Sequence, residues 1–235
     1  MAEWMPTHAE VMAATILMLS EEPVRSDALF IHGSQGDREL DEREMSRAAT
    51  LYCRKLFRKI VLNGLTAERC KKLNLAYSGY EVFHQGLRER GVWQGDIELL
   101  APSNHTAAES ENLLVLARNR GWERVTIMSY PHHQLRCFLS IVEAMRKLGI
   151  WIRVYNQSFR LEDSLWQKSM TKVVIAGGAA GGTPVEGDLR AHVAAEFARI
   201  VKYGQKSGDG FIPHATIEEA FAYIRGRDTR GREAT

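Results

Sequence analysis

The sequence predicts an α/β fold, a three-layer sandwich of helices around a mainly parallel sheet. Two observations predict it. From Asp27 onward, short apolar runs alternate with longer runs of helical period, and a glycine closes three of the helical runs. Alternation of this kind is typical of βαβ units, in which a crossover helix joins parallel strands.

Five short apolar runs are the predicted strands. Their sequences and ranges are ALFIHG (28–33), KIVLNG (59–64), DIELLA (96–101), RVTIMS (124–129) and WIRVYN (151–156). A weaker run, TKVVIAGG, is a candidate for one additional edge strand. The spacing leaves room for a helix between each strand and the next.

The predicted helices occupy those intervals. They cover 41–57, 67–91, 107–121 and 133–149, followed by a further helical pattern at 189–204. Gly91, Gly121 and Gly149 end three of them, at the position where a left-handed C-cap favours glycine. Residues 11–19 form an apolar run that predicts a short amphipathic helix ahead of the first strand.

The chain has 235 residues, enough for one main domain. We expect an N-terminal helix in 1–26, a core domain in 27–156 and a C-terminal extension in 157–235 that packs on the core. The extension contains a glycine-rich loop at 176–187 and ends in a frayed polar tail. This loop matches neither a P-loop nor GxGxxG, and it is either a flexible connection or a mobile lid over a ligand.

Composition excludes several classes of protein. The 31 basic and 29 acidic residues give a net charge of +2, so nucleic acid is not expected as a partner. The apolar run at 11–19 is shorter than the roughly 20 residues that span a bilayer, and no basic residue precedes Arg25, so neither a membrane segment nor a secretory signal is expected. Cys53, Cys70 and Cys137 form no CxxC pair, which favours reduced thiols in a cytoplasmic protein.

Ligands of open parallel sheets bind outside the carboxyl ends of the strands, so the segments that follow the strands are the candidate site. Its candidate binding residues are His32, Gly33, Ser34, Asn63, Gly64, Thr106, Glu109 and Ser129, and its candidate catalytic residues are His133 and Arg136. No HxH or HExxH spacing is present, so no metal site is predicted. The candidate nucleophiles are Ser34, Ser129 and Cys137, without a GxSxG motif around them.

Each candidate has a structural alternative. Gly33 and Ser34 suit a loop around phosphate or ribose oxygens, and they equally suit a simple turn. His32 ends its strand and points either to the ligand or into the core. Thr106 and Glu109 have the spacing of a capping box, and the same helix start favours an anion.

The stretch SYPHHQLR at 129–136 begins a predicted helix. Pro131 suits the first turn, where its missing N–H costs nothing. His132 and His133 are adjacent and face different directions, whereas His133 and Arg136 share a face. Arg136 is cationic and His133 can become cationic, and positive charge at a helix start opposes the helix macrodipole. Such local conflicts are typical of functional sites.

Four elements in this order resemble the YdcF-like family of bacterial proteins, a domain of unknown function shared by YdcF, SanA and ElyC. The elements are DALFIHGS, a strand ending in NGLT, SNHTAAE and VTIMSYPHHQLR, and the resemblance runs from about Asp27 to Tyr155. By position, the family's Thr-x-x-Glu falls on Thr106 and Glu109. Its strand-end serine, histidine and arginine fall on Ser129, His133 and Arg136.

This chain departs from the family at both glycine motifs. His32 and Ser34 flank Gly33 where leucine and glycine are usual, and Asn63-Gly64-Leu65 replaces Ser-Gly-Gly. The family arginine of the first helix has two candidates here, Arg43 and Arg47.

The resemblance implies a Rossmann-like fold and a small-molecule site at the strand ends. Part of the family is associated with S-adenosylmethionine, and other members with the cell envelope. We therefore expect a small anionic partner, S-adenosylmethionine or a nucleotide as candidate cofactors, and no membrane partner. The first hypothesis is a cytoplasmic protein that binds and acts on a phosphorylated or nucleotide-like molecule. A non-catalytic regulatory protein and a phosphoester hydrolase are the alternatives.

Overall fold

Five parallel strands form the central sheet in the computed structural model, which describes residues 6–33, 37–159, 173–175, 185–187, 195–201 and 214–230. The strands are β1 (Ala28–Ile31), β2 (Lys59–Asn63), β3 (Ile97–Leu100), β4 (Arg124–Met128) and β5 (Arg153–Gln157). Their order across the sheet is β3-β2-β1-β4-β5, and every neighbouring pair is parallel. This is the strand order of a Rossmann-like fold, which confirms the predicted fold class.

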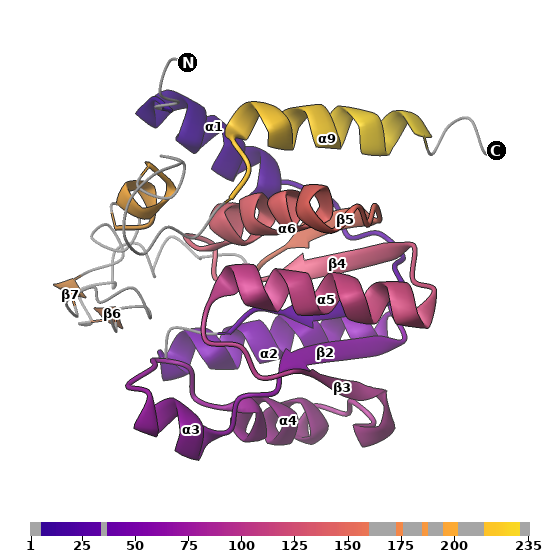
Figure 1. Ribbon diagram of the computed structural model, residues 1–235. Helices are drawn as coiled ribbons and strands as arrows, with labels where there is room; N and C mark the ends of the chain where they lie inside the picture. The colour runs from indigo at the N-terminus through magenta and orange to yellow at the C-terminus, as the bar shows by residue number, and fades with distance from the viewer. Residues whose placement is uncertain are drawn as a thin grey trace.

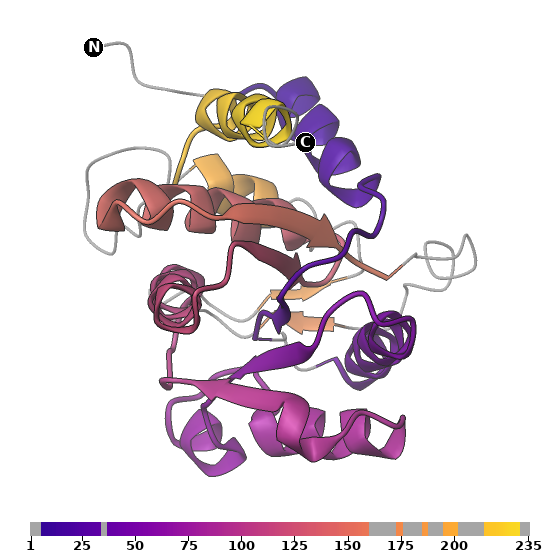
Figure 2. The same cartoon turned by 90° about the vertical axis from the view of Figure 1, so that its right-hand side faces the viewer.

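Helices cover both faces of the sheet (Figures 1 and 2). One layer contains α2 (Arg38–Cys53), α3 (Ala67–Lys72) and α4 (Tyr80–Glu89), and the other contains α5 (Thr106–Arg120) and α6 (Gln134–Leu148). A short 3-10 turn, η1 (Gln94–Asp96), precedes β3. The helices α1 (His8–Leu19) and α9 (Ile217–Arg230) come from opposite ends of the chain and pack together against α6.

The central strand shows why the sheet separates two cores. In β1, Leu29 and Ile31 pack toward α2 and α4, whereas Ala28 and Phe30 pack toward α5 and α6. All four side chains are buried, because β1 has a strand on each side and helices on each face. Burial of each large apolar side chain stabilises the fold by about 1.5–3 kcal/mol.

The single helix predicted over 67–91 is wrong, because the chain forms α3 and α4 with a loop between them. Asn74 and Gly79 in that loop have φ angles of 51° and 91°, which lie in the left-handed region and interrupt an α-helix. A Cβ atom on Gly79 would lie 2.4 Å from the backbone nitrogen of Ala67. The helical period of the sequence did not show that the helix is interrupted at these two residues.

The predicted glycine C-caps are confirmed. Gly121 and Gly149 are the C-cap residues of α5 and α6, with φ angles of 66° and 62°. Gly91 follows the last turn of α4 with a φ angle of 87°. The expected thiols are also free, since Cys53, Cys70 and Cys137 form no disulfide.

The prediction that TKVVIAGG adds an edge strand to the main sheet is wrong. β6 (Val173–Ile175) pairs with β7 (Val185–Gly187) in a separate antiparallel sheet. The outer edge of β5 is covered instead by side chains, because the Tyr223 hydroxyl accepts from Val154 N at 2.7 Å and donates to Ile152 O at 2.7 Å. Most of the glycine-rich loop, residues 176–184, lies outside the described residues.

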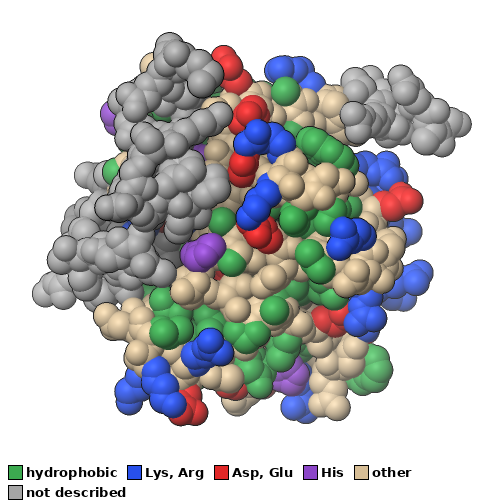
Figure 3. Space-filling view, viewed as in Figure 1, with side chains coloured by type: hydrophobic (Ala, Val, Ile, Leu, Met, Phe, Trp, Pro, Cys, Tyr) green, Lys and Arg blue, Asp and Glu red, His purple; other side chains and the backbone are tan. Residues whose placement is uncertain are grey.

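The surface over α5 and α6 carries acidic and basic side chains in mixed positions (Figure 3). Lys147 pairs with Glu111 at 2.7 Å, and Arg146 pairs with Glu143 at 2.6 Å. Within the described residues, no helix combines the length and apolarity needed to cross a membrane.

Candidate functional site

The polar residues predicted from the strand ends gather at one edge of the sheet. His32 follows β1, Asn63 ends β2 and Ser129 follows β4. Because the strands are parallel, these ends meet at the carboxyl edge, which lies on the left in Figure 1 beside the helical residues 195–201. β1 lies where the strand order reverses, which is the usual ligand position in this fold.

A buried histidine and carboxylate form the centre of this edge. His32 Nδ1 lies 2.9 Å from Glu109 Oε2, and both side chains are almost fully buried. The second carboxylate oxygen of Glu109 accepts from Asn63 Nδ2 at 2.6 Å and from the Gly33 backbone at 3.2 Å. A carboxylate oxygen only accepts, so His32 Nδ1 is the donor, and in a neutral imidazole Nε2 is then an acceptor.

The charge state of Glu109 follows from these contacts. Burial alone would raise its pKa, but the hydrogen bonds from His32, Asn63 and Gly33 outweigh burial and lower the pKa below its ordinary value. Glu109 is therefore a carboxylate at neutral pH. It holds the imidazole of His32 in one tautomer.

Asn63 connects the ends of β2 and β3 with α5. Its Oδ1 accepts from the backbone of Ser103 at 3.1 Å and of Leu65 at 3.2 Å, and its Nδ2 also donates to Ser103 O at 2.7 Å. These bonds use both ends of the amide inside the protein. Asn63 thus positions Glu109 and the loop after β3.

The capping box predicted for Thr106 and Glu109 is wrong. The N-cap of α5 is His105, whose Nδ1 accepts from Ala108 N at 3.1 Å. Because the His105 side chain caps this helix, the Glu109 carboxylate does not take part in capping and binds His32 instead. Thr106 is the first helical residue, and its hydroxyl accepts from Arg136 Nη1 at 3.0 Å.

The two predicted glycines have packing roles. A Cβ atom on Gly64 would lie 2.2 Å from Leu100 O, and one on Gly33 would lie 2.8 Å from Glu109 Oε1. Side chains at these positions would therefore separate β2 from β3 or displace the carboxylate. Ser34 lies outside the described residues.

His133 and Arg136 meet, as their spacing predicted, but a third residue joins them. Arg136 Nη2 lies 3.0 Å from His133 Nδ1, and Arg136 Nε donates to Glu196 Oε2 at 2.6 Å. Glu196 comes from the helical residues 195–201 and also pairs with Arg199. His133 itself is the N-cap residue of α6, and Pro131 lies in the preceding turn rather than in the helix.

His133 is neutral at physiological pH. Burial and the neighbouring Arg136 guanidinium lower its pKa to about 4, against an opposing effect of Glu196. The Nδ1 atom of His133 has two neighbours of opposite character, because the Arg136 guanidinium at 3.0 Å only donates and Glu196 Oε2 at 3.3 Å only accepts. His133 is thus a neutral imidazole between a cation and a carboxylate.

The side chains of Ser129 and Cys137 are both buried. Burial raises the pKa of the Cys137 thiol well above its ordinary value, and Arg136 and Ser129 offset that effect only in part. A protonated, fully buried thiol is a poor nucleophile.

The two candidate arginines of α2 also have partners. Arg43 pairs with Glu39, and Arg47 donates to Gln157.

Sequence reasoning missed two further acids at this edge. Asp41 accepts from the hydroxyls of Tyr130 and Ser78, whereas neither carboxyl oxygen of Glu44 has a hydrogen-bond partner within the described part of the chain. The two acids are three residues apart, on the buried face of α2, and this spacing is the sequence signal that could have revealed them. Across the described residues, no group of three or more His, Cys, Asp or Glu side chains could hold a metal ion.

Comparison with known proteins adds little to this geometry. No family model matches the chain. No curated protein matches it either. Among solved structures, it is similar to glucose-6-phosphate 1-dehydrogenase from Mycobacterium avium, with a TM-score of 0.34 and 17% identity over 57% of this chain and 29% of that chain.

Proposed function

We propose that this chain binds and acts on a phosphorylated or nucleotide-like small molecule at the carboxyl edge of the sheet. The observation that carries the proposal is His32 Nε2, a buried nitrogen without a hydrogen-bond partner among the described residues. An unsatisfied buried acceptor costs about 1–3 kcal/mol, and a ligand hydroxyl or amine would satisfy it. With Glu109 on Nδ1, this nitrogen is suited to accept a proton from the ligand.

The charge of the ligand is inferred from Arg136. Its guanidinium offers the planar set of donors that binds phosphate or carboxylate, and Thr106 lies against it. In the structure Glu196 provides the carboxylate that Arg136 binds. An anionic ligand group would share or replace this carboxylate, beside the neutral imidazole of His133.

The finer identity of the ligand comes only from the family resemblance. A YdcF-like protein would favour S-adenosylmethionine or a nucleotide, and a cytoplasmic location is part of the same proposal. The His32–Glu109 pair is compatible with either ligand, because both carry hydroxyl groups and a charged group that Glu109 or Arg136 could orient.

The first test identifies the ligand and then removes the proposed base. Mass spectrometry of small molecules that copurify with the native protein, followed by thermal shift, should give a phosphorylated or nucleotide-like compound that raises Tm. His32→Asn keeps a donor for Glu109 but removes Nε2. It should lower kcat roughly 100-fold to 10,000-fold, the range for loss of a general base, with a small effect on Tm.

His84→Asn provides the matched control, since His84 lies on α4, in the layer on the opposite face of the sheet from Glu109. The proposal fails if no compound of this class shifts Tm, or if His32→Asn retains full turnover.

A binding protein without chemistry is the second candidate. It is favoured by the His133–Arg136–Glu196 group, whose charges compensate one another without a ligand. A compound that raises Tm but remains chemically unchanged after prolonged incubation would support this candidate over an enzyme.

A further inference from the structure

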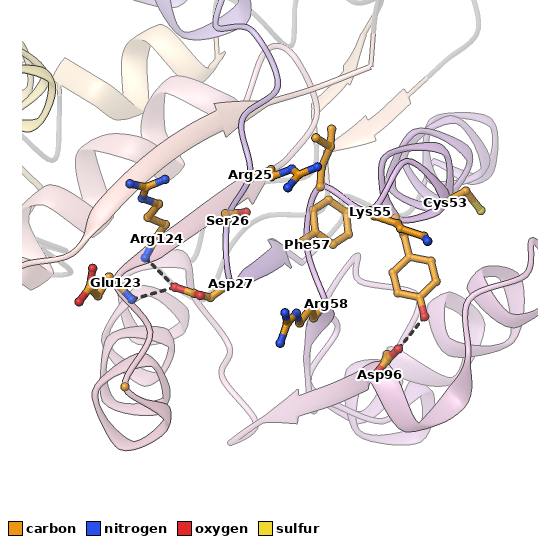
Figure 4. Close-up of a pocket in the computed structure, with 13 residues that line it drawn as sticks. Arg25, Ser26, Asp27, Cys53, Lys55, Phe57, Arg58, Asp96, Glu123 and Arg124 are labelled. Carbon is orange, nitrogen blue, oxygen red and sulfur yellow. Dashed lines mark hydrogen bonds between the residues drawn. The ribbon is translucent and has the colours of Figure 1, made fainter. Parts of the chain in front are cut away.

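A second candidate site lies at the opposite, amino-terminal edge of the sheet. Figure 4 shows a pocket there, and its volume is about 1040 Å³. Its walls come from the segments that precede β1, β2 and β4 and from η1. None of its lining residues belongs to the carboxyl-edge site.

The acids that line this pocket already have partners. Asp27 Oδ2 accepts from the backbone nitrogens of Glu123 and Arg124 at 2.8 and 2.9 Å, as the dashed lines in Figure 4 mark. Asp96 accepts from the Tyr52 hydroxyl at 2.6 Å and pairs with a lysine, Lys59, outside the pocket lining.

Glu123, the third acid of the lining, pairs with Arg153 at 3.1 Å. All three carboxylates of the lining are therefore engaged, two of them with cations from outside it.

The basic side chains of the lining differ in this respect. Arg25, Lys55, Arg58 and Arg124 are all exposed, and within the described residues none forms an ion pair with an acid. The lining thus has four cations without an acidic partner among the described residues, whereas two of its three carboxylates, Asp96 and Glu123, are already paired with cations from outside it.

Helix dipoles do not cancel this charge. The helices α2 and α5 end at this edge, at Cys53 and Arg120, and each helix C-terminus carries roughly half a negative charge. Two such ends contribute about −1, less than the charge of the four lining cations that have no acidic partner in the described part of the chain. Stabilisation of helix ends therefore explains some of the basic residues but not all of them.

We propose that the amino-edge pocket binds a small molecule that carries at least two phosphate groups. The guanidinium groups of Arg25, Arg58 and Arg124 come from three separate segments, before β1, before β2 and at the start of β4, and arginine binds a phosphate with paired hydrogen bonds. The volume lies at the upper end of the usual range for small-molecule sites, about 300–1,000 Å³. This site is independent of the proposed function at the carboxyl edge.

The test is isothermal titration calorimetry of the full chain with inorganic pyrophosphate and with orthophosphate. Arg58→Ala combined with Arg124→Ala removes two exposed guanidinium groups of the pocket. Pyrophosphate should bind the unmodified chain more tightly than orthophosphate does, and the double variant should raise its Kd roughly tenfold or more.

Arg69→Ala combined with Lys71→Ala is the control, because it removes the same charge from the exposed surface of α3. Its Kd for pyrophosphate should remain within about twofold of the unmodified value, since distant surface charges are screened by salt. The proposal is overturned if pyrophosphate does not bind, if both double variants weaken binding equally, or if a short DNA duplex binds the chain while pyrophosphate does not.

Discussion

At the scale of single residues, Glu44 is the least satisfied group in the described part of the protein. It is fully buried in α2, and both carboxyl oxygens lack a hydrogen-bond partner there. Burial raises its pKa well above 4.5, and the nearby carboxylates of Asp41 and Glu109 raise it further. Glu44 therefore keeps its proton in the folded protein at a pH where the unfolded chain has lost it.

This difference predicts a pH-dependent stability. Since the folded state binds the extra proton, the contribution of Glu44 to the free energy of unfolding decreases as pH rises from about 4.5 toward its folded pKa. Glu44→Gln should remove this slope. Glu44→Met, which removes both oxygens, should raise the free energy of unfolding at neutral pH by about 1–3 kcal/mol.

Urea denaturation at a series of pH values measures both effects. The exposed Glu39 on the same helix provides the control, because Glu39→Gln should follow the pH dependence of the unmodified protein. A destabilising Glu44→Met would show that Glu44 has a stabilising partner.

At the scale of elements, α9 and Glu21, which follows α1, close the edge of the sheet. The Tyr223 hydroxyl bonds to Val154 N and Ile152 O, Arg227 Nη1 donates to Val154 O at 2.7 Å, and Glu21 accepts from Asn156 N at 2.5 Å. Backbone groups of an edge strand that would otherwise bind another strand are thus occupied.

Tyr223→Phe should reveal the strength of this closure. It keeps the ring but leaves Val154 N and Ile152 O without their partner, which should lower the free energy of unfolding by about 1–3 kcal/mol, equivalent to roughly 2–10 °C in Tm for a protein of this size. Differential scanning calorimetry measures the change. Tyr155→Phe on β5 is the control and should shift Tm by less than about 2 °C. An equal effect of both substitutions would contradict the role given to the Tyr223 hydroxyl.

At the scale of the whole molecule, the helical residues 195–201 contact the core through apolar and charged side chains. Ile200 packs in the core beside α6, its carbonyl lies 2.9 Å from His214 Nε2, and Glu196 binds Arg136. Burial alone would raise the pKa of Glu196, but Arg136, His133 and Arg199 lower it well below 4.5. Its contribution to stability is therefore present above about pH 4.5 and is lost as pH falls through the folded pKa.

Glu196→Gln should consequently destabilise the protein at neutral pH by on the order of 3 kcal/mol, because the partly buried guanidinium groups of Arg136 and Arg199 lose their buried carboxylate. The difference from the unmodified protein should narrow below about pH 4.5. Chemical denaturation at neutral and acidic pH measures it, with the exposed Glu218→Gln as the control. A difference that stays constant with pH would exclude the ion pair as its cause.

The sequence by itself determined the arrangement of the fold. Apolar runs of strand length, helical periods and C-cap glycines are local signals, and they placed β1 to β5, α2, α5 and α6 within a few residues. They also placed His32, Asn63, Ser129, His133 and Arg136 at one sheet edge, because parallel strands end at the same side.

Only the tertiary structure decided which of these residues are partners. Glu109 binds His32, 77 residues away, rather than its own helix start, and Arg136 binds Glu196, 60 residues away. Periodicity carries no information on such distances, because they depend on how the chain returns across the sheet. The same limit hid the burial of Glu44 and the basic pocket at the amino edge, whose side chains come from segments that only folding brings together.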